Sequence, residues 1–244
     1  MKRRKTRGNA AKGFSLAESL ISLSLFFIIV MVSLEFFGAT RDLFLRIKNK
    51  QETKEAALAA LDKIRIDLQE GGSGLLMPVQ LGLIEGISEN NENLILLSKE
   101  KDILLLSNLN AGQTRIDLDG KHDIGKSRMI CIFDSEKGEV KTISDADTRS
   151  IILSSPLDFS YIKEKASLIL LRKVSFYLDK DNQILRRKVN ASPSQPLLEE
   201  VIFFDSSYKR DVNLVKLRLV LKPNKEKIYE ITVFPKNAAL ALMR

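Results

Sequence analysis

The sequence has few of the residues that form disulfides, bind metals or interrupt helices. It contains one cysteine, Cys131, so an intramolecular disulfide is impossible, and one histidine, His122, so a histidine-rich metal site is excluded. Neither G-x-S-x-G nor H-E-x-x-H occurs, which leaves no serine-hydrolase or zinc-protease motif. No proline precedes Pro78, and Gly38 is the only glycine between positions 14 and 71. Nothing in the first 70 residues therefore forces a long N-terminal helix to break.

The net charge of +8 is concentrated at the N-terminus. The first 13 residues contain six basic side chains and no acid, so the rest of the chain carries only 8 − 6 = +2. These basic residues are Lys2, Arg3, Arg4, Lys5, Arg7 and Lys12. Because no basic stripe with interleaved aromatic residues follows, direct nucleic-acid binding is not predicted.

An apolar segment follows this basic leader. From Phe14 to Leu34 there are 21 residues and a single charge, Glu18. A transmembrane helix needs roughly 20 apolar residues, whereas the apolar core of a cleaved secretory signal has about 7–15. The basic leader places the N-terminus in the cytoplasm and the C-terminal domain outside it. A carboxylate near hydrocarbon costs on the order of 2.5–3.5 kcal/mol or more, so Glu18 needs a partner or a function.

The stretch from Lys12 to Glu18, KGFSLAE, resembles the processing site of type IV prepilins and pseudopilins. The resemblance implies that a prepilin peptidase cuts between Gly13 and Phe14 and methylates the new amino terminus of Phe14. It also implies that Glu18, the fifth mature residue, pairs with the amino terminus of a neighbouring subunit. Removing one member of such a buried charge pair leaves the other unpaired.

Further apolar residues, spaced by three and four, predict that the helix continues as an amphipathic segment with one stripe packed on another surface. The stripe consists of Leu43, Ile47, Ala57, Leu61, Ile64 and Leu68. The helix is predicted from Phe14 to Glu70, with a soft point at Gly38. It ends at Gly71-Gly72-Ser73-Gly74, since glycine supplies turn conformations.

The remainder predicts short strands between polar turns. The expected strands are 94–97, 103–106, 128–133, 139–143, 150–153, 168–178, 184–189, 201–204, 214–221 and 228–234. Lys99–Asp102 is expected to be the turn of one hairpin and Asp179–Asn182 that of another; the latter lacks the glycine and glutamate of a calcium loop. Because no helices alternate with the strands, we predict an α+β, pilin-like fold with a mainly antiparallel sheet.

The expected organisation is a basic leader (1–13), a transmembrane half-helix (14–37), an amphipathic half-helix (38–70) and an extracytoplasmic β-rich head (71–244). Asp62–Leu68, Phe176–Arg187 and Pro196–Val201 are similar to segments of the J-type secretion pseudopilins and the W-type minor pilins.

This resemblance implies a structural subunit, not an enzyme, with no metal and no cofactor. It implies a single-pass inner-membrane protein that joins the tip or priming complex of a type IV pilus or a type II secretion pseudopilus. The implied partners are the prepilin peptidase, other minor pilins or pseudopilins, the major subunit, the inner-membrane assembly platform and membrane lipid.

Two alternatives remain open from the sequence. One is a signal-anchored extracytoplasmic binding protein that is not processed and does not depend on Glu18. The other is a membrane-tethered nucleotide-binding enzyme, because Gly120–Ser127 fits the pattern G-x-x-x-x-G-K-S. That motif requires a strand before the loop and a helix after it, and here residues 128–133 are predicted to form a strand. A solvated turn is the favoured interpretation.

Overall fold

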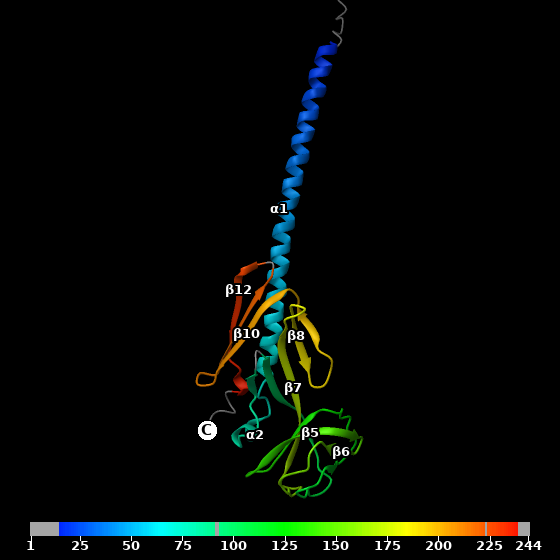
Figure 1. Ribbon diagram of the computed structural model, residues 1–244, viewed down its shortest axis with the longest axis vertical. Coiled ribbons are helices and arrows are strands. Elements are labelled where there is room, and N and C mark those ends of the chain that lie inside the picture. The colour runs from blue at the N-terminus through cyan, green and yellow to red at the C-terminus, as the bar shows by residue number, and fades with distance from the viewer. Residues whose placement is uncertain (1–14, 91–92, 223, 239–244) are drawn as a thin grey trace, which may run out of the picture. The chain divides into compact units, whose positions relative to one another are not determined.

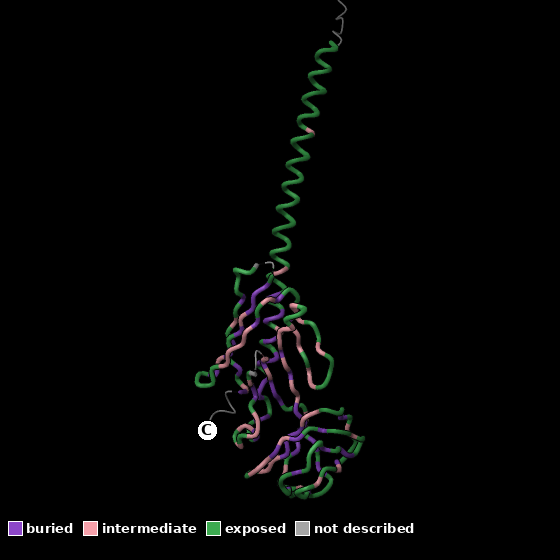
Figure 2. The backbone as a smooth tube through the Cα atoms, in the orientation of Figure 1, coloured by how far each residue is buried: buried purple, intermediate pink, exposed green. Residues whose placement is uncertain are grey.

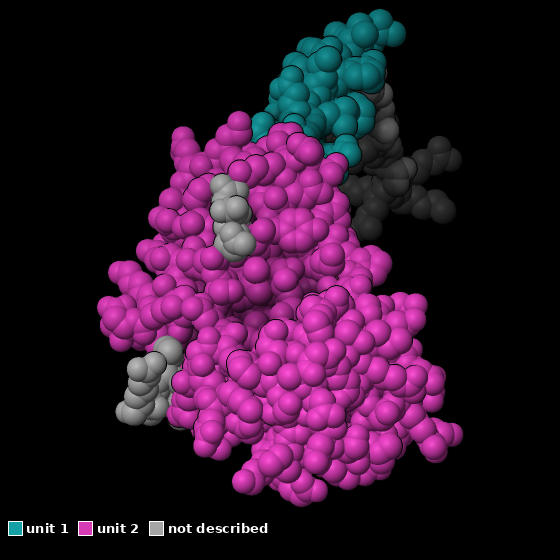
Figure 3. Space-filling view, turned by 60° about the horizontal axis from the view of Figure 1, so that its bottom comes forward, with its two compact units in different colours: residues 1–54 teal, residues 55–244 magenta. Residues whose placement is uncertain are grey.

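The computed structural model describes residues 15–90, 93–222 and 224–238, and it has an α+β layout (Figure 1). A long N-terminal helix is followed by a domain of mainly antiparallel β-sheet. The chain divides into two compact units, residues 1–54 and residues 55–244 (Figure 3). The boundary lies within the helix, so the helix contributes residues to both units.

The elements follow one another with few helices among the strands. They are α1 (Leu16–Glu70), α2 (Leu76–Gln80), β1 (Ile87–Asn90), β2 (Asn93–Ile103), β3 (Arg115–Asp117), β4 (Met129–Phe133), β5 (Gly138–Asp147), β6 (Ser150–Leu153), β7 (Ser167–Asp179), β8 (Ile184–Val189), β9 (Gln195–Leu198), β10 (Val201–Lys209), β11 (Leu214–Leu221) and β12 (Asn224–Val233).

Helix α1 runs without interruption through Gly38, the expected soft point, and ends at Glu70 as predicted. The glycines after it are needed for two physical reasons. Gly72 has φ +80°, and a Cβ there would lie 2.9 Å from the Cα of Ala238. The backbone of Gly86 passes so close to Gly72 that a Cβ added at position 86 would lie 2.6 Å from the Cα of Gly72. Only glycine fits this crossing, and it provides the chain reversal that stops the helix.

The strands form a nine-stranded sheet and a three-stranded sheet, and every strand pairing within the described residues is antiparallel. Strand β7 is central to the larger sheet. Along one edge it pairs with β2, and along the other it pairs first with β4 and then with β8. The smaller sheet has the order β10-β11-β12.

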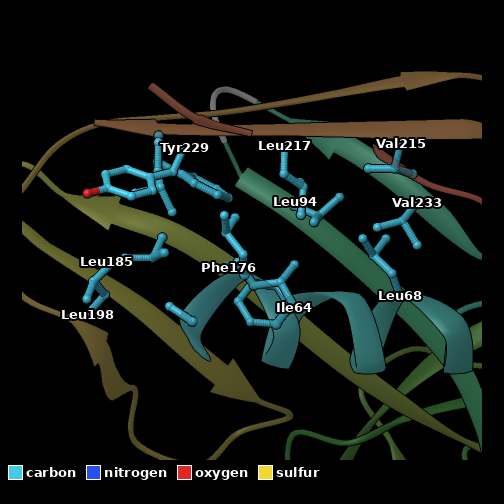
Figure 4. Packing of buried hydrophobic residues seen from close by; sticks show 14 of the residues in the cluster. Ile64, Leu68, Leu94, Phe176, Leu185, Leu198, Val215, Leu217, Tyr229 and Val233 are labelled. Carbon is cyan, nitrogen blue, oxygen red and sulfur yellow. The ribbon is translucent and has the colours of Figure 1, made fainter. Parts of the chain in front are cut away.

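The larger of the two main cores joins the C-terminal part of α1 to both sheets. Figure 4 shows Ile64 and Leu68 of α1 on one side of this cluster and Leu217 and Tyr229 of the three-stranded sheet on the other, with Phe176 of β7 between them. A separate core fills the lobe formed by β3 to β6 and the start of β7. Burial is thus concentrated in residues 55–244, whereas the helix before them is exposed almost throughout (Figure 2).

The structure corrects the hairpin predicted around Lys99–Asp102. These residues lie inside one long strand, β2, which pairs with β7 over its length and carries a bulge between Lys99 and Lys101. The bulge accommodates the polar run without a turn, and Lys99 and Asp102 form an ion pair at 3.0 Å. The hairpin predicted at Asp179–Asn182 is confirmed, because β7 ends at Asp179 and pairs with β8 from Ile184.

Candidate functional site

In the first unit, the apolar side chains of α1 are not covered by any other described residue of that unit. From Leu16 to Phe37 the large apolar side chains are exposed on all sides, including Leu16 at 82%, Met31 at 69% and Phe36 at 72%. Ser24 and Ser33 donate hydrogen bonds to the carbonyl oxygens of Leu20 and Ile29, four residues earlier. Their hydroxyls are therefore satisfied inside the helix. By length and composition this helix can cross a membrane.

Glu18 has a local partner that the sequence analysis missed. Its carboxylate accepts a hydrogen bond from the backbone N–H of Ser15 at 2.9 Å, and its own N–H donates to the Ser15 hydroxyl at 3.3 Å. This reciprocal pair is a capping box, and S-x-x-E was its visible signal in the sequence. The carboxylate also lies in the first turn, where the positive end of the helix dipole favours it. Glu18 is therefore not an unsatisfied charge within the chain.

The predicted processing site, Gly13 and Phe14, lies outside the described residues. The structure places Glu18 in the first turn of the described helix. The Glu18 carboxylate is accessible to another molecule, because the residue is exposed and its hydrogen bond to Ser15 uses only one oxygen. The remaining lone pairs of the carboxylate can accept hydrogen bonds from a cationic group of another molecule.

The second acidic feature of α1 lies in the other unit and is buried. The Asp67 side chain is 1% exposed, and both its oxygens accept hydrogen bonds from Arg187 of β8, at 2.7 and 3.1 Å. Arg172 of β7 and Lys63 of α1 approach the same carboxylate at 3.6 and 3.8 Å. A planar guanidinium on a carboxylate fixes orientation as well as charge. This contact joins the end of α1 to β7 and β8.

The predicted apolar stripe is buried only in this second part of α1. Ala57, Leu61, Ile64 and Leu68 belong to the larger core. Leu43 and Ile47, which continue the same spacing in the first unit, are 59% and 56% exposed. For these two residues the expectation of a packed stripe is wrong within this chain.

The phosphate-binding pattern at Gly120–Ser127 has the wrong surroundings. Strand β4 follows almost directly, so no helix N-terminus is available to hold phosphates. Lys126, which would contact a nucleotide, instead pairs with Asp145 at 3.0 Å. The segment is irregular and mostly exposed, as expected of a turn, but Ile124 within it is buried in the core of the β3 to β6 lobe. The strand–loop–helix context that the alternative requires is contradicted.

Strand β5 contributes two buried charged residues, Glu139 and Lys141, to a cluster in the lobe of β3 to β6. The ammonium group of Lys141 lies 3.0 Å from Glu139 and 2.8 Å from Asp158. Glu139 also accepts the backbone N–H groups of Asp158 and Phe159, which attaches the loop after β6 to the sheet. Burial raises the pKa of the nearby Tyr161 hydroxyl above its ordinary value. All the charges are paired, so this cluster is structural.

Within the described part of the chain, no group of three or more metal-binding side chains is present. Cys131 is buried in β4, and burial raises its pKa to about 12. A thiol held protonated in this way is a poor nucleophile.

No protein-family model and no curated protein matches the chain. Two solved structures are similar over short segments. The tailspike gp61 of Pseudomonas phage phi297 has 8% identity and a TM-score of 0.27, covering 30% of this chain. The tailspike gp49 of Pseudomonas phage LKA1 has 15% identity and a TM-score of 0.26, covering 31% of this chain. The chain covers 14% of each tailspike.

Proposed function

We propose that this chain is a minor pilin or pseudopilin, cut between Gly13 and Phe14 by a prepilin peptidase and methylated on Phe14. The observation that carries the proposal is an apolar helix with a capped acid in its first turn, preceded by a basic leader and KGF. An ordinary membrane anchor does not need an acid in its first turn, because a carboxylate near hydrocarbon costs free energy. A pilin-like fold, with one long helix packed by its C-terminal part on antiparallel strands, accords with the arrangement of α1 and the sheets.

In this proposal the exposed apolar surface of residues 16–37 has two successive environments. Before assembly it lies in the inner membrane, with the leader in the cytoplasm and the head outside. After assembly it packs against the helices of other minor pilins and the major subunit at the filament tip. The same side chains can serve both environments, since lipid tails and packed helices are both apolar and water-free.

Glu18 would change partners between these two states. In the single chain its carboxylate is bonded to the Ser15 N–H. In the assembly its carboxylate would also accept a hydrogen bond from the charged amino terminus of a neighbouring subunit. Cleavage before Phe14 in that subunit creates this amino terminus. A capped glutamate is already oriented by its own backbone, so less side-chain freedom is lost when the second partner arrives.

Processing is tested by co-expression of the full chain with a prepilin peptidase, followed by mass spectrometry of the N-terminus. The expected product begins with N-methylated Phe14. Cells expressing the same chain with a catalytically inactive peptidase provide the control and should yield the uncut precursor. A chain that still carries Met1 to Gly13 beside the active enzyme would overturn the proposal and favour the signal-anchored binding protein.

The two roles of Glu18 are separated by a pair of substitutions. Glu18→Gln keeps a side-chain oxygen that can accept the capping-box hydrogen bond but removes the charge, whereas Glu18→Ala removes both the oxygen and the charge. We expect both variants to be inserted and cleaved normally. Both should be recovered in the cross-linked tip complex at least about tenfold less than wild type, because each leaves a neighbouring amino terminus unpaired.

If Glu18→Gln assembles like wild type, Glu18 is a helix cap only and the proposed intersubunit contact is wrong. A loss of assembly confined to Glu18→Ala would lead to the same conclusion. The processing experiment is unaffected by this result, so the family assignment and the role of Glu18 are tested separately.

A further inference from the structure

A groove lies where two strands meet along the same edge of β7. Strand β4 pairs with Ser167–Leu171, and β8 pairs with Val174–Asp179, so a seam falls between these two segments. Asn190, with φ +51°, closes the seam. Its backbone N–H donates to the Lys173 carbonyl at 2.7 Å, and its side-chain oxygen accepts the Lys173 N–H at 2.8 Å. The backbone at the seam is therefore held in place by hydrogen bonds on both sides.

The seam opens on the face of the sheet opposite the larger core. Val174 and Phe176 point into that core, so the alternating residues Leu171, Lys173 and Ser175 lie on the other face. The groove there has a volume of about 560 Å³, within the roughly 300–1,000 Å³ of small-molecule sites. Its lining consists of Ser127, Arg128, Met129, Thr142, Leu171, Lys173, Ser175, Lys188, Asn190 and Ala191.

Three of the lining side chains are cationic and none is acidic. Among the described residues, no ion pair or hydrogen bond engages the ammonium groups of Lys173 and Lys188. Arg128 uses its Nη2 to donate to the Glu100 carboxylate and the Leu171 carbonyl. Its Nε is buried and has no acceptor among the described residues. Even after Glu100 is counted, the groove keeps an excess of two positive charges.

Lys173 and Lys188 differ in this respect from the lysines of the same unit that form ion pairs. Lys99, Lys126 and Lys141 each lie within 3.0 Å of a carboxylate. Cations on a folded surface are usually solvated or paired, and a concave surface that gathers them without acids concentrates positive potential. The groove is therefore suited to an anionic ligand.

The other lining groups define the class of anion. The hydroxyls of Ser127, Thr142 and Ser175 can both donate and accept hydrogen bonds, which matches the hydroxyls of a sugar. Met129 adds a small, partly buried apolar surface, whereas Leu171 is fully buried. The lining contains no aromatic ring, so the stacking platform used by single-stranded nucleic-acid sites is missing from it.

We propose that this groove binds an anionic carbohydrate, with Lys173 and Lys188 on its carboxylate or sulfate groups and the three hydroxyls on its sugar hydroxyls. The proposal does not depend on assembly into a filament. It assigns a ligand class to the head, and the residues that bind the ligand lie on β5, β7 and β8 and just before β4.

The test uses the full-length chain in zwitterionic detergent at low salt, with isothermal titration calorimetry. The probe is a trigalacturonate, and its neutral methyl ester is the matched ligand control. We expect the trigalacturonate to bind and the ester to bind at least about tenfold more weakly, since it offers no charge to the lysines. Raising the salt concentration should weaken binding of the charged probe.

The variant is Lys173→Gln with Lys188→Gln, expected to raise the Kd of the trigalacturonate about tenfold or more. The control is Lys209→Gln with Lys225→Gln, which removes the same total charge from β10 and β12, outside the groove lining. This control should change the Kd less than about twofold, because distant charges are screened. Circular dichroism of both double variants checks that the sheet is retained.

Three outcomes would overturn the proposal. Absence of trigalacturonate binding at millimolar concentration would remove the site. An equal loss in both double variants would show attraction by net charge alone. Binding of inorganic phosphate or of a short single-stranded DNA, with the same dependence on Lys173 and Lys188 but without trigalacturonate binding, would show an anion site of another class.

Discussion

The two parts of α1 share one continuous helix but differ in what their side chains meet. Residues 16–54 are exposed almost throughout, with apolar groups on all sides up to Phe37, whereas residues 55–70 bury one stripe and expose the rest. One acid in each part illustrates the difference. Glu18 is exposed and bonded to its own backbone, and Asp67 is buried and bonded to Arg187.

This difference shows that apolar spacing alone does not decide where a helix packs. Leu43 and Ile47 continue the spacing of Leu61 and Ile64, yet only the second pair is buried. Lys50 and Lys54 interrupt the stripe between the two pairs. Long cationic side chains on the packing face require water, so the packed segment begins only after them.

The largest expected effect comes from Asp67. Asp67→Ala leaves the largely buried guanidinium of Arg187, 13% exposed, without its carboxylate, which should lower the free energy of unfolding by about 3–5 kcal/mol. The matched control is Asp62→Ala, five residues earlier, whose ion pair with Arg65 is about half exposed. That change should cost at most about 1 kcal/mol. Urea unfolding of the full-length chain in mild detergent measures both, and equal losses would contradict the buried role of Asp67.

A pair of isoleucines tests the packed and unpacked parts of the stripe directly. Ile64 is fully buried, and Ile64→Ala should cost about 2–5 kcal/mol through lost burial and a cavity. Ile47 is 56% exposed, and Ile47→Ala should stay within about 0.5 kcal/mol. The same unfolding assay compares them. A large loss at Ile47 would mean that the first part of α1 packs on the chain after all.

The smallest expected effect on the free energy of unfolding is at Asp158, an exposed acid that contrasts with the buried Asp67. A hydrogen bond from the Lys141 ammonium group, and then its charge, hold the pKa of Asp158 below 3.8. Stability from this pair is present above the unfolded-state value of 3.8 and is lost as the pH falls through the lower folded-state pKa.

Asp158→Asn should therefore flatten part of the decline in unfolding free energy between about pH 5 and pH 3. Urea unfolding across that range is the measurement. Asp123→Asn removes the same charge from an exposed position and breaks no ion pair among the described residues, so it serves as the control. An unchanged acid-side slope in Asp158→Asn would show that water screens the Lys141 pair completely.

Most regular elements were predictable because their signals are local. The end of α1 at the glycines, the hairpin at Asp179–Asn182 and the bounds of β8 and β11 agree with prediction. The capping box at Ser15 and Glu18 was equally local and could have been found. The continuous strand at Lys99–Asp102 could not, because a charged run resembles a turn unless its pairing with β7 is known.

The sequence by itself determined the apolar, glycine-poor helix, the basic leader and the antiparallel class of the sheet, since composition and short-range spacing govern these features. Only the tertiary structure decided which part of the helix is buried, that Asp67 meets Arg187 across 120 residues, and that Lys173 and Lys188 share a groove. These contacts depend on strand order and register, and no local pattern encodes the meeting of residues so far apart in the chain.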